Sequence, residues 1–292
     1  MNKSFHRRAW AGFAVLLVLM PGCPSERPDP AVEREREGIE AVRIEGTGAI
    51  LDPGAGFWNE APAFSVQLQP QVVVDPRLPE AAVGELEARA VHNGEWIGMR
   101  LRWADETRDD VLRTADFGDQ VAVQFPIDPH GPLPSAMMGH EGAPVNVVQW
   151  RAPFQRDLDE GAPDIFDLYP YALVDIYPDE VLGVIDARAY TGALGVDNPI
   201  SRPYESPVLD QIAEGWGSLT VKPIQLADGR GVWNDGEWTV VITRPLFPIT
   251  PNDPDLRPGT ATNAAFAVWE GGSGETGARK SWALWVPLRV AE

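Results

Sequence analysis

The sequence predicts an all-β protein, a β-sandwich of antiparallel strands with a few short helices in long loops. Apolar and polar residues alternate at a period of two in several short segments, which is typical of strands with one buried face. Turn signals separate these segments, and few stretches show a helical period. No internal repeat is present. We therefore expect the strands to form two packed sheets.

The clearest element is a hairpin. Leu86, Ala88 and Ala90 alternate with charged residues, and residues 97–103 alternate in the same way. Asn93-Gly94 lies between the two segments, and this dipeptide favours a type I′ turn. The pattern predicts two antiparallel strands that bury one face.

Further elements follow in chain order. Residues 105–110 are expected to form an acidic, solvated loop, and residues 153–171 an irregular, acidic segment. Ser206-Pro207 resembles a helix N-cap with proline at the first position, so a short helix ending at Gly215 is expected. Residues 197–199 mark a long loop, and residues 234–236 a second hairpin turn. The other expected strands are 120–125, 145–150, 238–243, 266–269 and 280–290.

The chain divides into three expected parts. Residues 1–22 read as a lipoprotein-type signal peptide, in which three basic residues precede the apolar stretch 9–20. Residues 23–45 are expected to be a disordered tether, because they are rich in Pro, Glu and Arg. Residues 46–292 form the predicted domain, and roughly 250 residues suffice for one large all-β unit.

Cys23 is the single cysteine of the chain, and Gly22-Cys23 resembles the cleavage site of a bacterial lipoprotein. Its placement favours acylation at Cys23 over a plain secretory signal with a chance cysteine. We expect an exported protein, held by lipid on the periplasmic side of a bacterial membrane or periplasmic. A single cysteine leaves no internal disulfide, no Cys-based zinc site and no Cys-x-x-Cys-His attachment for c-type haem.

The charge is strongly acidic, with 24 basic and 43 acidic side chains and a formal net charge of −19. Nucleic acid and anionic lipid surfaces are therefore poor partners, whereas a basic protein such as a small soluble cytochrome would be attracted. The alternative is that the acidic charge serves solubility alone. The sequence contains no Gly-x-Ser-x-Gly, His-Glu-x-x-His or phosphate-loop motif. No catalytic residue is indicated.

Two adjacent methionines stand out between two expected strands. Beyond the N-terminal segment the chain holds only Met99, Met137 and Met138, and Gly139-His140 follows the last pair. A thioether is a soft ligand that suits haem iron and copper, and it is also ordinary core filler. The methionines alone leave both interpretations open.

Lysine is equally rare, with Lys222 and Lys280 the two beyond the N-terminal segment. A buried lysine can lose its proton and become a ligand, whereas an arginine effectively cannot. In a continuous strand Lys280 shares a face with Trp282, Val286 and Leu288, where a charge is costly. The alternative is that Lys280 begins the strand and its amine reaches water. Lys222 precedes Pro223 after a polar stretch and is expected at the surface.

From about Leu51 to the C-terminus the sequence resembles a known family, the haem b-binding γ subunits of ethylbenzene dehydrogenase, dimethylsulfide dehydrogenase, and selenate and chlorate reductases. The resemblance is carried by Leu101-x-Trp103-x-Asp105-x-Thr107, Asp119 with Val121-Ala122-Val123-Gln124-Phe125-Pro126, Met138-Gly139 with Pro144-Val145-Asn146 and Trp150, Asn198-Pro199, Gly215-Trp216-Gly217, Trp238-Thr239-Val240-Val241, Arg244-Pro245-Leu246, and Arg279-Lys280-Ser281 with Trp285.

The resemblance implies one non-covalent haem b in a β-sandwich, with a methionine and a lysine as axial ligands. By the motif, Met138 is the methionine, because it directly precedes the glycine, and Lys280 is the lysine. Met137 is the alternative thioether, and the imidazole of His140 is a weaker alternative ligand. The implied partners are iron–sulfur and molybdenum subunits of a periplasmic oxidoreductase and a soluble c-type cytochrome.

Two functions are therefore considered. The first is electron transfer by a haem b protein without substrate turnover of its own. The second is a carbohydrate-binding or adhesion lipoprotein on a related sandwich, since the 11 tryptophans suit stacking on sugar rings. The pair Met138 and Lys280 favours haem.

Overall fold

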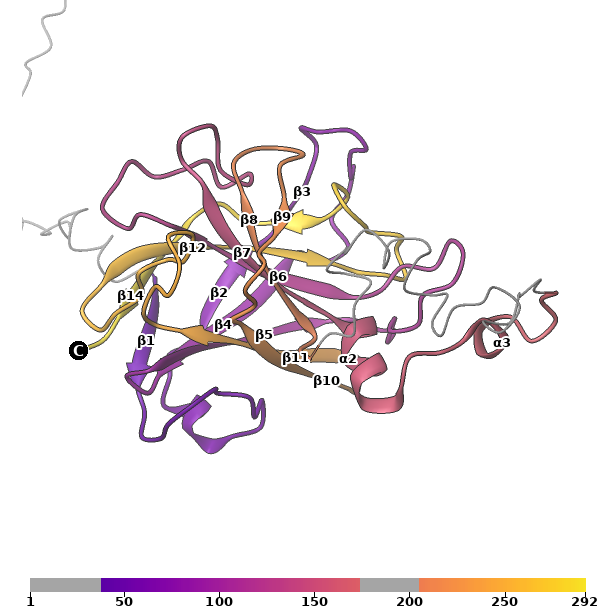
Figure 1. The fold of residues 1–292 in the computed structure, drawn as a ribbon, viewed down its shortest axis with the longest axis horizontal. Coiled ribbons are helices and arrows are strands. Elements are labelled where there is room, and N and C mark those ends of the chain that lie inside the picture. The colour runs from indigo at the N-terminus through magenta and orange to yellow at the C-terminus, as the bar shows by residue number, and fades with distance from the viewer. Residues whose placement is uncertain (1–37, 174–204) are drawn as a thin grey trace, which may run out of the picture. The chain divides into compact units, whose positions relative to one another are not determined.

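The computed structural model describes residues 38–173 and 205–292, and it confirms the predicted all-β sandwich (Figure 1). Helical structure in these residues is confined to connections: a 3₁₀ helix at Gly56–Asn59, α2 at Ala152–Glu160 and α3 at Ile165–Leu168. The expected signal peptide, Cys23 and the loop at 197–199 lie outside the described residues. Among the described helices, none is long and apolar enough to cross a membrane.

The first sheet has the strand order β10-β11-β5-β4-β1-β14-β12. Its strands are β10 (Asp228–Asn234), β11 (Glu237–Pro245), β5 (Trp96–Ala104), β4 (Glu85–His92), β1 (Ile39–Arg43), β14 (Val286–Val290) and β12 (Ala261–Trp269), with β2 (Phe64–Gln67) paired to β4. Most neighbours are antiparallel, but β1 runs parallel to both β4 and β14.

The second sheet continues from β12 in the order β12-β6-β7-β8-β9. It comprises β6 (Gln120–Pro126), β7 (Val145–Arg151), β8 (Val208–Ala213) and β9 (Thr220–Val221), with β13 (Ser281–Trp282) beside β12 and β3 (Gln69–Pro70) beside β13. Strand β12 belongs to both sheets, because residues 261–264 pair with β14 and residues 265–269 pair with β6.

The main core lies between the two sheets. The inward positions of the second sheet follow the period of two, so Val121 and Val123 of β6 and Val148 and Trp150 of β7 are fully buried. Trp150 crosses to the first sheet, where a Cβ on Gly231 would lie 2.3 Å from its indole ring. Gly231 is therefore needed for this close approach of the sheets.

The hairpin of β4 and β5 forms as predicted, but the predicted type of its turn is wrong. Strands β4 and β5 form the predicted hairpin, with the expected buried positions. The type I′ prediction for Asn93-Gly94 is wrong, because only Gly94 has a positive φ and three residues connect the strands. Asp235-Gly236 has φ values of 49° and 82° and forms the two-residue turn between β10 and β11.

Three predicted boundaries are corrected. The tether does not extend to residue 45, because β1 begins at Ile39 and pairs in the middle of the first sheet. The helix expected after Ser206-Pro207 is strand β8, whose inward positions complete the core. The segment 153–171 is not irregular throughout. It contains α2, and α3 with a capping box between Asp164 and Asp167.

The last predicted strand is interrupted. Residues 283–285 separate β13 from β14, and the Trp285 indole donates to the carbonyl of Pro134 at 2.7 Å instead of following the strand. Trp282 faces one cluster and Ala283 the main core, so the continuous face assumed for Lys280 does not exist.

The acidic loop is not simply solvated. Carboxylate oxygens of Asp105, Asp109, Asp119 and Glu270 lie within 4.8 Å of one another, and the first and third of these residues are buried. Burial raises the pKa of Asp105 to about 6 and the pKa of Asp119 to about 7. The charges of Glu270 and Asp109 add to the rise at Asp105, and the charge of Asp105 adds to the rise at Asp119. Asp119 holds the connections together by accepting hydrogen bonds from Gly271 N, Asp109 N and Trp238 Nε1.

Candidate functional site

A cavity of about 330 Å³ lies on the outer face of the second sheet. Its floor is formed by the outward positions of β12, β6 and β7. These positions pair across the sheet in three rows: Trp269–Gln120–Arg151, Ala267–Ala122–Gln149 and Ala265–Gln124–Val147. The same alternation that fills the core with valine and tryptophan therefore builds the floor.

Small side chains explain why this face is hollow. Ala122, Ala265 and Ala267 occupy the centre of the floor and are nearly inaccessible to solvent. Larger residues stand around them, with Trp269 on the floor and Trp282 beside it on β13. The centre of the floor is therefore low and apolar, with glutamines and Arg151 in the rows around it and the rings of Trp269 and Trp282 beside it.

The methionine loop covers one end of the cavity. The Gln124 amide of the third row donates to the carbonyl of Ala136 at 3.2 Å, and Met137 and Met138 both line the cavity. Met138 adopts a φ of 70°, which is uncommon for a residue other than glycine, and its carbonyl accepts from Gly215 N at 2.8 Å. The loop is thus tied to the segment that carries Trp216.

Gly139, next to Met138, has a structural reason of its own. Its φ is 73°, and a Cβ there would lie 2.8 Å from the carbonyl oxygen of Ala143. Only glycine fits this position, so the Met-Gly pair fixes the path of the loop.

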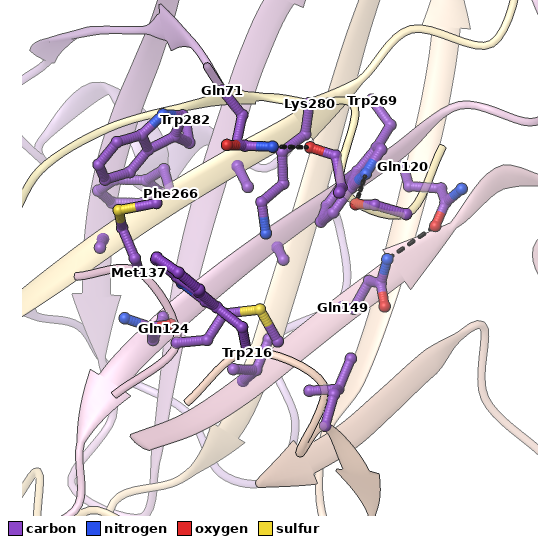
Figure 2. Close-up of a pocket in the computed structure, with 18 of the residues that line it drawn as sticks. Gln71, Gln120, Gln124, Met137, Gln149, Trp216, Phe266, Trp269, Lys280 and Trp282 are labelled. Atoms are coloured by element: carbon purple, nitrogen blue, oxygen red, sulfur yellow. Dashed lines mark hydrogen bonds between the residues drawn. The ribbon is translucent and has the colours of Figure 1, made fainter. Parts of the chain in front are cut away.

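Lys280 reaches the same cavity from the segment before β13. Figure 2 shows its side chain entering toward Trp216, with Trp269 beside it. The Nζ atom lies 5.2 Å from the centroid of the Trp269 ring, in the first row of the floor. Among the described residues, no carboxylate lies within ion-pair distance of it. Burial lowers the pKa of the Lys280 amine to about 8.

The two predicted ligands, Met138 and Lys280, line one cavity, and so does the alternative thioether, Met137. Figure 2 shows the Met137 side chain beside Trp282 and Phe266, whereas Lys280 lies near Trp269. His140, the weaker candidate, is exposed and outside the cavity lining, and its Nδ1 accepts from Ser135 N at 3.3 Å.

The first row also brings Arg151 into the cavity, and the sequence analysis did not single it out. Gln149 donates to Gln120 at 2.7 Å, and Gln211 donates to Gln149 at 3.0 Å, so a chain of amides runs along this end. Strand β7 is buried on both faces, so its sequence lacks the alternation that would have placed Arg151 and Gln149 together on the outer face.

Lys222 is the second lysine beyond the N-terminal segment, and the prediction that it lies at the surface is wrong. Its side chain is buried, with Nζ 2.9 Å from Asp210 Oδ2 and in contact with Asp253. Arg244 also pairs with Asp253 at 3.2 Å and contacts the amide of Asn146. Two cations and two carboxylates thus form a neutral buried network, which compensates the cost of burying each charge.

This network explains the state of Asp253. Burial tends to raise the pKa of its carboxyl, but the hydrogen bond from Lys222, the backbone N–H of Thr250 and the Arg244 charge outweigh it. The pKa of Asp253 is held well below its usual range. Lys222 is therefore a charged structural residue, whereas Lys280 is a cavity amine without an acidic partner.

Most of the described chain is similar to one known protein family. The family described as "Ethylbenzene dehydrogenase" matches residues 55–172 and 225–281. The chain belongs to this family. The matched residues include the methionine loop, the floor strand β6 and Lys280, and so cover most of the cavity wall.

Two individual relatives share about a quarter of their aligned residues with this chain. A Haloferax mediterranei protein named "Putative respiratory nitrate reductase heme subunit ORF7" is 24% identical over 286 residues, 98% of this chain and 84% of that protein. The chlorate reductase subunit gamma of Ideonella dechloratans is 25% identical over 268 residues, 89% of this chain and 87% of the relative.

Among solved structures, a carbohydrate binding module family 9 from Caldicellulosiruptor kristjanssonii in complex with cellotriose aligns with a TM-score of 0.39 and 8% identity. The alignment covers 87% of this chain and 93% of that one.

Proposed function

We propose that this member of the family is a haem-binding electron-transfer subunit that holds one non-covalent haem b between Met138 and Lys280. The observation that carries the proposal is the Lys280 amine, which faces an apolar cavity without an acidic partner while two thioethers line the same cavity. The two relatives bear the names of a heme subunit and a gamma subunit, which are not the names of catalytic subunits.

The cavity residues fit a haem. The low, apolar centre of the floor, with the rings of Trp269 and Trp282 beside it, suits an aromatic ligand. A thioether and a neutral amine are suitable axial ligands for iron. When bound, the haem iron supplies one-electron redox chemistry, and the protein sets its potential through ligands and burial.

The chain's own residues would act in defined ways. Lys280 must give up its proton to offer a lone pair, and burial already lowers its pKa to about 8. Met138 needs no proton change, and its strained backbone supports it over Met137 as the ligand. Met137 remains the alternative, because it lines the same cavity.

The same reasoning extends to partners. As a γ-type subunit the protein would exchange electrons with an iron–sulfur subunit of a molybdenum oxidoreductase and with a soluble c-type cytochrome, and would turn over no substrate itself. The formal net charge of −19 supports a basic cytochrome partner. Acylation at Cys23 would hold the protein on the periplasmic side of the membrane, or it would be periplasmic.

A carbohydrate-binding role is the second candidate. Trp216 lines the cavity and is 56% exposed, and an exposed indole can stack on a sugar ring. Two cationic side chains and no acidic one among the described cavity-lining residues favour an anionic ligand over a neutral sugar.

The direct test is the absorption spectrum of the full-length protein after haem-replete periplasmic expression, oxidised and reduced. Haem b that acid–acetone extracts, with a low-spin spectrum, is expected. A colourless protein that binds oligosaccharides instead would replace this proposal with the second candidate.

A further inference from the structure

Arg151 is the last residue of β7 and points outward with Gln149 into the cavity. It pairs across the sheet with Gln120, which pairs in turn with Trp269, the ring that Lys280 approaches. Adjacent strands lie about 4.8 Å apart, so the backbones of Arg151 and Trp269 are separated by about 10 Å. Arg151 therefore lies at one edge of the floor, away from the amine.

The Arg151 guanidinium has no anionic partner among the described residues. Its Nε is buried without a hydrogen-bond acceptor, and its closest aromatic contact is Phe154, whose ring centroid lies 5.2 Å from Cζ. Burial lowers the pKa of Arg151, and no neighbouring charge opposes that shift. By contrast, the buried Arg244 is paired with Asp253, and Arg102 with Glu237 at 2.6 Å.

Arg151 is half-buried, and a buried guanidinium nitrogen without an acceptor, such as its Nε, is costly and is normally satisfied in protein structures. The fork of N–H donors matches a carboxylate in a bidentate manner. Within the described lining, Arg151 and Lys280 are the basic side chains and no acid is present. Lys280 is neutral when it ligates iron, so Arg151 is the lining side chain that keeps its positive charge, although the chain as a whole carries a formal charge of −19. A cavity with this charge inside an acidic protein selects an anionic ligand.

The neighbouring glutamines are already engaged. Gln120 Oε1 accepts from Gln149, Gln120 Nε2 donates to the carbonyl of Gly118, and Gln149 Oε1 accepts from Gln211. These hydrogen-bonded amides fix the wall beside Arg151, so the guanidinium is the donor at this edge that has no acceptor among the described residues.

We propose that Arg151 forms a carboxylate subsite at the edge of the cavity, which binds a propionate of the haem and so sets the orientation of the macrocycle relative to Lys280. The assignment to a propionate rests on the proposed function. It concerns a different part of the ligand from the axial bonds, so the two can fail separately.

The test compares haem with haem dimethyl ester, in which both carboxylates are blocked. Both are added to the haem-extracted full-length wild type, to Arg151→Gln and to Arg151→Lys. The control is Arg230→Gln, which removes an exposed ion pair between Arg230 of β10 and Asp159 of α2. Affinity is measured by absorbance titration, and haem loss from the holoprotein by transfer to an excess of a haem-free acceptor protein.

Wild type and Arg230→Gln should bind haem at least tenfold more tightly than the ester, as expected for one charge-assisted pair. Arg151→Gln should lose that preference by weakening haem binding while leaving ester binding unchanged. Arg151→Lys should retain part of it, because charge remains but the bidentate geometry does not. Arg151→Gln removes an unpaired charge, so thermal unfolding of its haem-free form should show no loss of stability.

Equal affinity of wild type for haem and ester would overturn the subsite while leaving haem binding intact, as would an unchanged preference in Arg151→Gln. Failure of every variant to bind either compound would overturn the proposed function and this assignment together.

Discussion

The Nζ atom of Lys280 lies 5.2 Å from the centroid of the Trp269 ring, at the edge of a cavity whose described lining contains no carboxylate. Lys222, the other lysine of the described chain, has two carboxylates within ion-pair distance. The same side-chain type thus has opposite environments, and the two lysines should differ in their response to substitution.

Lys222→Met should destabilise the protein by about 3–5 kcal/mol, because it leaves Asp210 and Asp253 buried without their shared cation. Urea unfolding followed by tryptophan fluorescence measures this difference. The control Arg257→Gln removes a surface pair with Asp255 and should leave the free energy of unfolding almost unchanged. Equal effects of the two substitutions would contradict the description of the buried network.

Lys280 should make the haem-free protein more stable as pH rises from about 8 to about 10.5. Its folded-state pKa is lowered to about 8, so in this window the unfolded chain binds the proton that the folded chain has released. The slope should be at most about 1.4 kcal/mol per pH unit. Lys280→Met should flatten the profile, measured by urea unfolding at each pH, and the exposed Arg279→Lys should not.

The acidic cluster predicts a dependence of the opposite sign at lower pH. The folded-state pKa values of Asp105 and Asp119, about 6 and 7, lie above that of an unfolded aspartate. The folded protein therefore binds more protons than the unfolded chain between about pH 4 and pH 7, and stability should fall as pH rises through this window.

Asp119→Asn should reduce this fall, whereas the exposed Asp116→Asn should not. Subtracting the variant profile from that of the wild type isolates the contribution of Asp119 from that of Asp253, which acts in the opposite direction. An identical pH profile for wild type and Asp119→Asn would show that the carboxyl titrates normally in the folded protein.

Ala122→Leu should abolish haem binding without unfolding the protein. Ala122 lies at the centre of the cavity floor, and the added atoms enter the cavity and not the core between the sheets. Haem titration and circular dichroism measure the two effects, with the exposed Ala63→Leu as the control for side-chain size. Normal haem binding by Ala122→Leu would place the haem elsewhere.

Strand alternation predicts part of the fold, and the rarity of methionine and lysine points to two residues of the cavity. The hairpin β4–β5 follows from its alternation, strands β6, β7 and β11 form where they are predicted, and the rare Met138 and Lys280 do lie at one cavity. Their role as iron ligands stays a prediction. The family match confirms the resemblance.

The misses have physical causes. Strand β1 was assigned to the tether because its partners β4 and β14 are distant in sequence, and a five-residue strand gives a weak local signal. Lys222 appeared exposed because Asp253, one of its two partners, lies 31 residues away. Arg151 was overlooked because its strand is buried on both faces, so only the fold reveals that its guanidinium shares a cavity with Lys280.

The visible and near-infrared spectra of Lys280→Arg against pH, compared with wild type, decide whether Lys280 ligates the haem iron. Arginine is also a long basic side chain, but it stays protonated and has no lone pair to give. Lys280→Arg should lose the sixth ligand and contain a high-spin or water-ligated haem, whereas Arg279→Lys should be unchanged, and acid should displace the amine in wild type. A low-spin spectrum of Lys280→Arg that matches wild type at every pH would contradict the ligand role of Lys280.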